Sequence, residues 1–296
     1  MTLAFGSDDE KRCAMRFSVT LVATDQSITV AEFAQAVEER GLDGLWLPDH
    51  THMPVERVNA YPLGGELPER YKRTIDPLVG LAMAAAVTDR IRVGTGVMLP
   101  AQRDPIVTAK ALATIDQQSG GRLAVGVGFG WNEAEVADHA VDPKTRRRRT
   151  REHVRAMQQL WERDVASLDG EFVRFAPSWS WPKPVQRPLP VLIGGAATPT
   201  VFEHVVDYAQ GWIPLGGRGL ADSITRLRRQ CEDAGRDSAS LQIVPFVGMG
   251  ASREKVDAFE RAGATEVAFE APSAASTEVL TALDQVADLM QRQRNR

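Results

Sequence analysis

The stretch IRVGTGVMLPAQRDPIVTAKALATIDQQ, residues 91–118, contains one complete strand–helix unit. Its first part, Ile91–Met98, is rich in the apolar and β-branched residues that favour an extended strand. Its second part, Ile106–Gln118, repeats apolar side chains at the three- and four-residue spacing of an amphipathic helix. Pro105 stands at the first turn of that helix, where an N–H group would have no partner inside the helix. The stretch therefore predicts one strand of a parallel sheet followed by its crossover helix.

The same unit recurs from one end of the chain to the other. The predicted strands are Arg16–Val22, Gly44–Leu47, Ile91–Met98, Arg122–Val127, Pro190–Ile193, Gly211–Pro214, Leu241–Val247 and Glu266–Phe269. The helices that alternate with them are Val30–Arg40, Pro77–Val87, Ile106–Gln118, Arg147–Trp161, Pro199–Tyr208, Leu220–Ala234, Arg253–Ala262 and Thr277–Arg292. Eight repeats of this kind predict an α/β fold of the (β/α)8, or TIM-barrel, type. A doubly wound open sheet is the alternative, because counting to eight from one sequence is error-prone.

The composition is that of an ordinary globular protein. The chain has 296 residues, of which 43% are hydrophobic and 25% charged, and this length is within the range of one barrel domain. A net charge of -4 gives no indication of binding to nucleic acid, and no run of about 20 apolar residues predicts a membrane helix. Cys13 and Cys231 lack zinc-site spacing, which indicates reduced thiols and a cytoplasmic protein. Residues 1–15 are predicted to be a disordered leader that precedes a single domain, residues 16–296.

Two connections are longer than ordinary turns. Thr51–Ile75 follows the second strand and contains Tyr61, Tyr71 and several prolines. Because loops that follow barrel strands form the active-site rim, this segment is predicted to be a lid. Asp169–Leu189 is an insertion before the fifth strand, which reads as a hairpin followed by the crossing PSWSWPKPVQRP. It follows a helix, so it is expected at the opposite rim and is given no lid role.

The second strand ends in LWLPDHTHMP, Leu45–Pro54, which places Asp49, His50 and His52 close together. A His-x-His pair at a strand end also begins the metal site of barrel hydrolases. Zinc requires three or four ligands, however, and among the later strand ends only Glu270 offers one. No metal is therefore predicted at this pair.

Glycines interrupt the third and fourth strands. The third contains Gly94 and Gly96, and the fourth, RLAVGVGFGWNEAE, contains a G-x-G-x-G run centred on Gly128. Such glycines mark either a bend of the barrel or the close approach of a backbone or a flat ligand. The run is not a dinucleotide-binding fingerprint, which requires a further glycine three residues on at the start of a helix. Its end places Trp131 and Asn132 at the rim instead.

The fifth strand ends in four small residues, Gly194, Gly195, Ala196 and Ala197, directly before a helix that begins near Pro199. Unpaired amides at a helix start bind anions, which makes this end a candidate phosphate site, and a tight turn without a ligand is the alternative. Together with the aspartate–histidine pair and the glycine-containing strands, this end suits a flat redox cofactor that carries a phosphate. The sequence contains no P-loop and no nucleophile elbow.

In their order and spacing, these segments resemble the luciferase-like monooxygenase superfamily, and within it the branch that uses the deazaflavin coenzyme F420. The matching segments are LWLPDH, IRVGTGVMLP, GRLAVGVGFGWNEAE, KPVQRPLPVLIGG and GWIP. The resemblance extends from about Met15 to the last helix. It implies a TIM barrel with the cofactor at the C-terminal mouth of the strands.

The resemblance also implies roles for single residues. His50 is the proton donor or acceptor beside the reactive face, since imidazole titrates near neutrality. Asp49 binds the cofactor or orients that histidine. A non-prolyl cis peptide behind the deazaflavin ring matches Gly96–Val97. The residues implied on the cofactor side are Asp49, Gly96, Val97, Gly128, Trp131, Asn132, Gly194, Gly195, Ala196 and Ala197.

One position departs from the F420-dependent sugar-phosphate dehydrogenases of this family. Those enzymes offer a glutamate to the substrate after the fourth strand, where this chain has Trp131. Their basic residues for the sugar phosphate also have no convincing counterparts here. The substrate is therefore predicted to be a more apolar or aromatic small molecule, with His52, Tyr61 and Tyr71 on its side of the site.

The predicted function is hydride transfer between F420 and a small organic substrate. The first alternative is a two-component monooxygenase that receives reduced FMN from a partner, and the second is a barrel that binds a cofactor without catalysis. An F420 or flavin reductase is expected as an indirect partner. Members of the family are often homodimers, and the apolar helices that flank the first four strands offer an interface.

Overall fold

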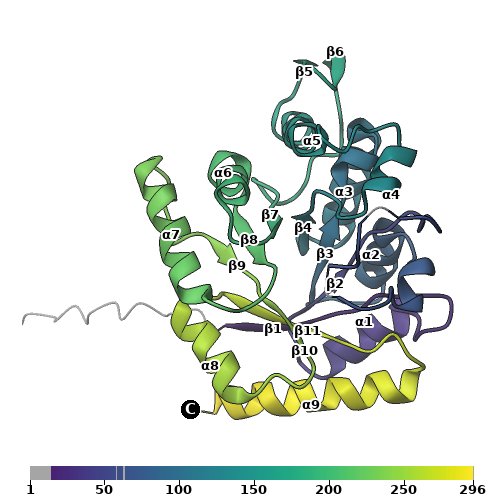
Figure 1. Ribbon diagram of the computed structural model, residues 1–296, viewed down its shortest axis with the longest axis vertical. Helices are drawn as coiled ribbons and strands as arrows, with labels where there is room; N and C mark the ends of the chain where they lie inside the picture. The colour runs from purple at the N-terminus through teal and green to yellow at the C-terminus, as the bar shows by residue number, and fades with distance from the viewer. Residues whose placement is uncertain (1–14, 58, 63, 296) are drawn as a thin grey trace, which may run out of the picture.

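The computed structural model describes residues 15–57, 59–62 and 64–295, and strands alternate with helices throughout (Figure 1). The barrel strands are β1 (Arg16–Thr20), β2 (Gly44–Leu47), β3 (Arg92–Met98), β4 (Leu123–Val127), β7 (Val191–Gly195), β8 (Gly211–Pro214), β9 (Gln242–Ile243), β10 (Phe246–Gly248) and β11 (Glu266–Glu270). Each strand that the sequence predicts is present. Met15 is buried, so the last residue of the predicted leader belongs to the domain. The rest of that leader, residues 1–14, lies outside the described residues.

The sheet is parallel and closes on itself. β1 pairs with both β2 and β11, and β9 and β10 are two halves of the seventh barrel strand, interrupted at Val244 and Pro245. The interruption does not open the sheet, because Val244 N–H donates to the carbonyl of Trp212 at 3.0 Å and Pro245 accepts from Ala268 at 3.0 Å. The fold is therefore the predicted barrel, and the open-sheet alternative is wrong.

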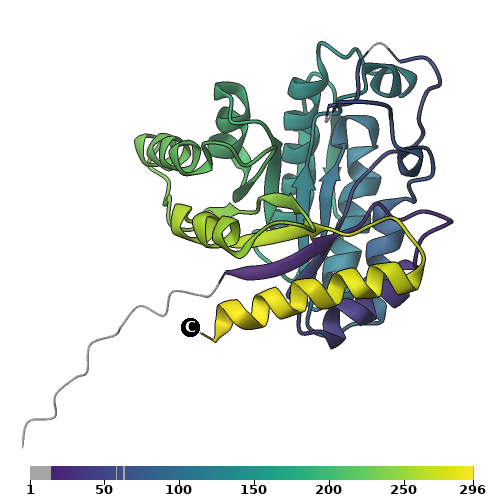
Figure 2. The same ribbon diagram turned by 60° about the horizontal axis from the view of Figure 1, so that its bottom comes forward.

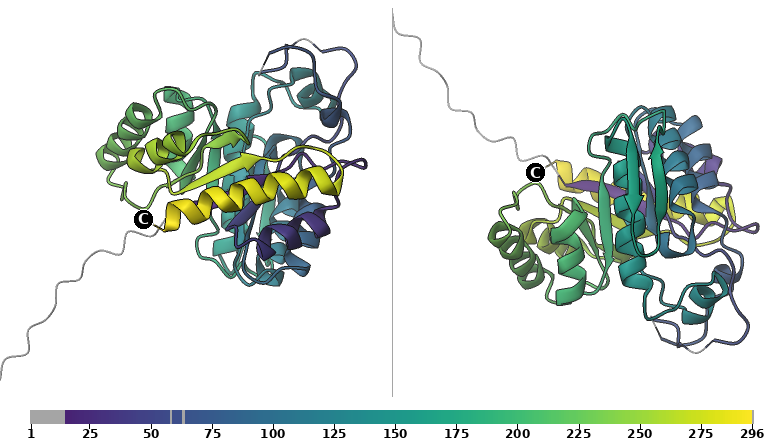
Figure 3. Two further views of the ribbon diagram at one scale, coloured as in Figure 1. Left: turned by 90° about the horizontal axis from the view of Figure 1, so that it is seen from below. Right: turned by 90° about the horizontal axis from the view of Figure 1, so that it is seen from above.

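Helices surround the barrel on its outer side (Figure 3). They are α1 (Val30–Glu39), α2 (Pro77–Ala86), α3 (Pro105–Gln118), α5 (Arg146–Glu162), α6 (Pro199–Tyr208), α7 (Leu220–Asp233), α8 (Arg253–Ala262) and α9 (Ser276–Arg294). The last helix runs beside α1 and completes the ring (Figure 2). Two of the predicted helix starts have capping aspartates, Asp76 and Asp104, whose carboxylates accept the N–H groups of the second and third helical residues.

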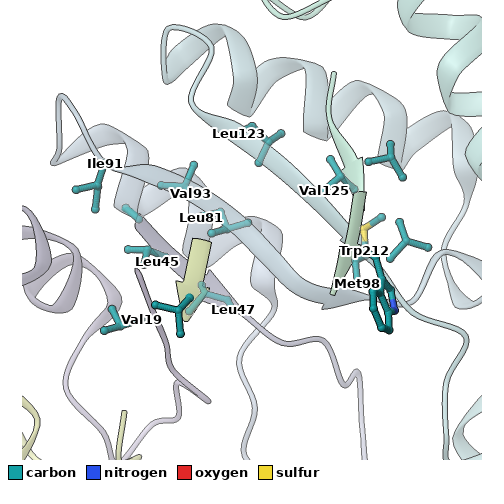
Figure 4. Packing of buried hydrophobic residues seen from close by; sticks show 14 of the residues in the cluster. Val19, Leu45, Leu47, Leu81, Ile91, Val93, Met98, Leu123, Val125 and Trp212 are labelled. Atoms are coloured by element: carbon teal, nitrogen blue, oxygen red, sulfur yellow. The ribbon is translucent and has the colours of Figure 1, made fainter. Parts of the chain in front are cut away.

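The core has two parts. Between the strands and the helices, Leu45, Leu47 and Val93 pack with Leu81 of α2 in a continuous apolar layer (Figure 4). A smaller cluster inside the barrel contains Trp46, Ala124, Leu192, Ile213, Val244 and Ala268. The Trp46 indole explains one strand glycine, because a Cβ atom at Gly94 would lie 2.5 Å from its ring. Gly94 therefore makes room for the core and not for a ligand.

A buried ionic network lies among the N-terminal halves of the barrel strands. The carboxylate of Glu266 is fully buried, and it accepts from Arg92 at 2.8 Å, from Arg16 at 3.0 Å and from the Trp46 indole at 2.7 Å. Burial alone would raise the pKa of Glu266, but the two guanidinium groups outweigh it and hold the pKa below its usual range. The network belongs to the end of the barrel opposite the mouth.

The short elements lie in the loops. They are η1 (Glu69–Lys72), η2 (Pro100–Gln102), α4 (Glu133–Asp138) and the antiparallel hairpin β5 (Ala166–Asp169) with β6 (Arg174–Ser178). The hairpin is the one predicted before the fifth barrel strand. It lies outside α5, where Glu152 accepts N–H bonds from Glu171, Phe172 and Val173. Within the described ranges, no helix has the length and apolar character needed to cross a membrane.

Candidate active site

His50 follows β2 at the mouth of the barrel and is 8% exposed. Its Nδ1 lies 2.8 Å from Oε2 of Glu135 in α4, and the other carboxylate oxygen of Glu135 accepts the N–H of Thr51 at 3.1 Å. A carboxylate only accepts, so Nδ1 carries a proton and Nε2 is left with the lone pair of the neutral ring. Glu135 is almost fully buried and thus fixes both the orientation and the tautomer of His50.

Glu135 was not predicted as a site residue. It lies 85 positions from His50 in the sequence, and its helix has only six residues, which is too short for a clear periodic pattern. The available signal was a glutamate four residues after Trp131, close to a strand end where catalytic groups of barrels gather.

Asp49 is held by partners other than His50. Its carboxylate accepts two bonds from Arg103, at 2.7 and 2.9 Å, and one from the N–H of Leu99 at 3.0 Å. Arg103 also pairs with Asp76 at 2.8 Å. Burial favours the neutral guanidinium, yet the two aspartates outweigh it and raise the pKa of Arg103. The prediction that Asp49 orients His50 is wrong, because its oxygens join the end of β2 to the turn after β3.

Aromatic rings surround His50 on the mouth side. The ring centroids of Tyr71 and Trp131 lie 5.5 and 6.0 Å from that of the imidazole, both in edge-on arrangements. Tyr61 packs 5.3 Å from Tyr71 and 6.0 Å from Trp131, and the two tyrosine hydroxyls share a hydrogen bond of 3.0 Å. Burial raises the pKa of Tyr71, so its hydroxyl stays protonated. We call Tyr61, Tyr71 and Trp131 the aromatic wall.

The loop after β2 carries two members of this wall and is attached to the barrel at several points. Arg70 pairs with Glu270 at the end of β11, and Arg73 with Asp25 at 2.7 Å. Nearer β2, the Met53 sulfur accepts from the side-chain amide of Asn132 at 3.2 Å. Asn132 is therefore turned toward the lid, and its buried Oδ1 has no hydrogen-bond partner among the described residues.

The predicted cofactor residues of β3, β4 and β7 meet at one place. The Gly96–Val97 peptide is cis, as the resemblance implied, and the register between β3 and β4 shifts there. The Val97 side chain lies between the other two strands, because a Cβ atom at Gly128 or Gly194 would come within 2.4 or 2.7 Å of its methyl groups. These two glycines thus make room for Val97, so the surface that a flat ligand would meet here includes an isopropyl group.

The end of β7 is held by its neighbours. The carbonyl of Gly195 accepts the Trp212 indole N–H at 2.9 Å and the N–H of Leu215 at 3.0 Å. Thr198 is the N-cap of α6, accepting from Val201 at 3.3 Å. Ala196 and Ala197 lie between these two points, so the proposed phosphate turn is backed by both a strand and a capped helix.

His52 faces away from the strand end and toward α4. Its Nε2 lies 3.0 Å from Oδ2 of Asp138 and its Nδ1 3.0 Å from the Thr51 hydroxyl, which also contacts His139 at 2.7 Å. The described part of the chain contains no group of three or more histidine, cysteine or carboxylate side chains arranged to hold a metal ion. These contacts fasten α4, and with it Glu135, to the turn that carries His50.

The mouth therefore combines an oriented imidazole, an aromatic wall and three strand ends that meet at Val97. A sequence model of luciferase-like monooxygenases matches residues 15–295. The chain belongs to the luciferase-like monooxygenase family. It is an oxidoreductase, and the (β/α)8 barrel is the fold that this family shares.

Three relatives show the range of the family around this chain. An uncharacterized protein of Mycobacterium tuberculosis is 42% identical over 277 residues, which is 92% of this chain and 98% of that protein. The F420-dependent glucose-6-phosphate dehydrogenase of Kineococcus radiotolerans is 30% identical over 78% of this chain and 66% of its own length. The FMNH2-dependent dimethylsulfone monooxygenase of Pseudomonas putida is 31% identical over 56% of this chain and 45% of its own length.

Solved structures agree on the fold. A monooxygenase from Streptomyces bottropensis superposes with a TM-score of 0.74 at 21% identity, covering 95% of this chain and 100% of that one. The coenzyme F420-dependent tetrahydromethanopterin reductase of Methanopyrus kandleri also has a TM-score of 0.74, at 17% identity, with 95% and 99% covered. At these identities the likeness concerns the barrel alone.

Proposed function

We propose that this protein is an F420-dependent oxidoreductase that exchanges a hydride between coenzyme F420 and a small organic substrate, with His50 handling the accompanying proton. The observation that carries the proposal is the Glu135–His50 pair at the mouth, next to the strand ends around Val97. The Kineococcus radiotolerans relative, whose cofactor is F420, supports the choice of cofactor.

The residues present fit a planar cofactor with a phosphate. Val97, backed by Gly128 and Gly194, offers an apolar surface for the rings. The turn at Ala196 and Ala197 leads into the start of α6, where Thr200, the residue after Pro199, offers an N–H to a phosphate. When bound, F420 supplies the hydride chemistry, and the protein supplies position and a proton relay.

His50 is suited to moving a proton. Nδ1 is held by Glu135, so proton exchange with the substrate falls to Nε2. When Nε2 takes up a proton, the ring becomes a cation and the Glu135 carboxylate 2.8 Å away stabilises that charge. When Nε2 gives the proton up, the same contact returns the ring to one tautomer. The pair thus serves either direction of hydride transfer.

The aromatic wall indicates which class of substrate the site favours. By the resemblance, Trp131 stands where the sugar-phosphate dehydrogenases of the family have a glutamate for their substrate. Its ring packs edge-on to that of His50. An indole and two phenol rings favour an apolar or aromatic molecule through buried area and ring contacts. We therefore place the substrate among small apolar organic compounds and not among phosphorylated sugars.

The test is a titration of the purified protein with F420 and with FMN, followed by turnover of the better ligand. F420 is expected to bind at least tenfold more tightly. Tighter binding of FMN would instead favour a monooxygenase supplied with reduced flavin by a reductase, which the Pseudomonas putida relative makes the second candidate. Tight F420 binding without turnover of any substrate would favour the remaining alternative, a barrel that binds the cofactor without catalysis.

A further inference from the structure

A second hollow adjoins the mouth on the side away from β4. It is a groove of about 740 Å³ between the ends of β10 and β11 and the first turns of α9. Its floor and sides include Met249, Pro272 and the exposed face of α9 at Thr281 and Gln285. The volume is that of a ligand pocket for a small organic molecule. None of these residues belongs to the site predicted from the sequence.

The groove and His50 share a wall. Arg70 of the lid and Glu270 at the end of β11 both line the groove and form an ion pair with each other. The Arg70 guanidinium also lies 5.5 Å from the ring centroid of Tyr71, and that centroid lies 5.5 Å from the one of the His50 ring. The contacts His50–Tyr71, Tyr71–Arg70 and Arg70–Glu270 therefore form a continuous row of side chains from the proton-transfer position to the groove.

The side chains that line the groove carry more negative than positive charge. Arg70 is the only cationic side chain among the residues that border the groove, and Glu270 neutralises it. Glu278 also borders the groove and forms no ion pair within the described residues, so the lining carries one net negative charge. An anion that enters the groove meets carboxylates and must compete with Glu270 for Arg70. A neutral or cationic group finds carboxylate acceptors and an apolar floor.

We infer that this groove is a second substrate subsite, selecting molecules with an apolar body and a neutral or cationic hydrogen-bond-donating end over anions of the same shape. The inference rests on the proposed function for its connection to catalysis, because the substrate would extend from His50 past Tyr71 into the groove. In this subsite Glu270 and Arg70 select the substrate and take no part in proton transfer.

The experiment compares three probes that share one body and differ in charge: phenylbutanol, phenylbutylamine and phenylbutyrate. Their affinities are measured by ligand-observed NMR on the full chain, with and without F420. The alcohol and the amine are expected to bind at least tenfold more tightly than the carboxylate. The Glu270→Gln variant frees Arg70, so its affinity for the carboxylate should rise at least tenfold while that for the amine falls.

A second variant tests the location. Thr281 is exposed on α9 and borders the groove, so Thr281→Phe should weaken binding of the alcohol at least fivefold. Asp288→Phe adds the same ring to an exposed position of α9 outside the groove and should have no effect. Equal affinity for all three probes, no binding of any, or equal behaviour of the two variants would overturn the inference. Loss of F420 binding alone would overturn the proposed function instead, since the probes also report on the protein without F420.

Discussion

At the scale of single residues, the proposed proton relay depends on the pairing of His50 with Glu135. The Glu135→Gln variant keeps a hydrogen-bond acceptor but removes the charge that stabilises the imidazolium. Turnover is expected to fall about 10- to 100-fold, the usual effect of losing a partner that orients a functional histidine. Glu56→Gln, the same change at an exposed position of the lid, is the control and should leave turnover unchanged.

Replacement of His50 itself has a larger expected effect. His50→Ala removes the proton relay, and general acid–base groups contribute about 10²- to 10⁴-fold to a rate. F420 affinity should stay within a few-fold of wild type, since the ring surface is built by other residues. Turnover of the variant at the wild-type rate would exclude the relay role.

Replacing Asp49 tests whether its carboxylate stabilises the strand end or binds the cofactor. Its 1% exposed side chain is paired with Arg103, so Asp49→Ala should lower the free energy of unfolding by about 3 kcal/mol, as expected when one partner of a buried ion pair is lost. Denaturant unfolding checks the stability and fluorescence titration the F420 affinity. A stable variant that no longer binds F420 would instead support the cofactor-binding role that the resemblance implies for Asp49.

A buried histidine away from the mouth predicts how stability depends on pH. Burial, followed by Arg151 and Arg147, lowers the pKa of His204 to about 4, and its Nδ1 lies 2.8 Å from the Tyr208 hydroxyl. The unfolded chain takes up this proton near pH 6.5 and the folded chain only near pH 4, so the contribution is full above pH 6.5. It is lost as the pH falls toward 4, by up to about 3 kcal/mol. The unfolding free energy of His204→Asn, measured by denaturant unfolding, should depend less steeply on pH in that window than that of the wild type. An unchanged slope would contradict this prediction.

At the scale of elements, the lid is the part whose attachment can be tested separately. Arg70 ties it to the end of β11, whereas Arg57 of the same loop contacts only the carbonyl of Pro54, at 3.4 Å, among the hydrogen bonds of the described residues. Arg70→Met keeps the apolar stem and removes the charge, so amide hydrogen exchange over residues 64–75 should become faster. Arg57→Met should not change it, and equal exchange in both variants would show that the ion pair does not hold the lid.

The sequence predicted the elements well because each barrel strand is a short apolar run and several helices begin at a proline. It did not predict α4, since six residues show no helical period, nor the break in the seventh strand at Pro245. The partners of the site were missed for a different reason. Glu135 meets His50, Arg103 meets Asp49, and Val97 fills the space at Gly128 and Gly194 across large sequence separations that no local pattern records.

At the scale of the whole molecule, α2 and α3 expose an apolar face that a monomer does not need. Val79, Met83, Ile106 and Val107 are 62%, 47%, 43% and 68% exposed on these neighbouring helices. Exposed apolar side chains on neighbouring helices favour association, and we predict a homodimer through this face. Light scattering should give the mass of a dimer for the wild type and of a monomer for Val107→Glu. Val55→Glu, at a 95% exposed position of the lid, is the control and should remain dimeric.

The proposed function requires a planar cofactor that lies against Val97 with His50 at its edge. The most direct measurement is a crystal structure of the protein with F420. It should show the deazaflavin rings on Val97, the phosphate at the start of α6, and the His50 imidazole still held by Glu135. Rings bound outside the mouth, or a mouth that excludes F420 while the protein is folded, would contradict the account.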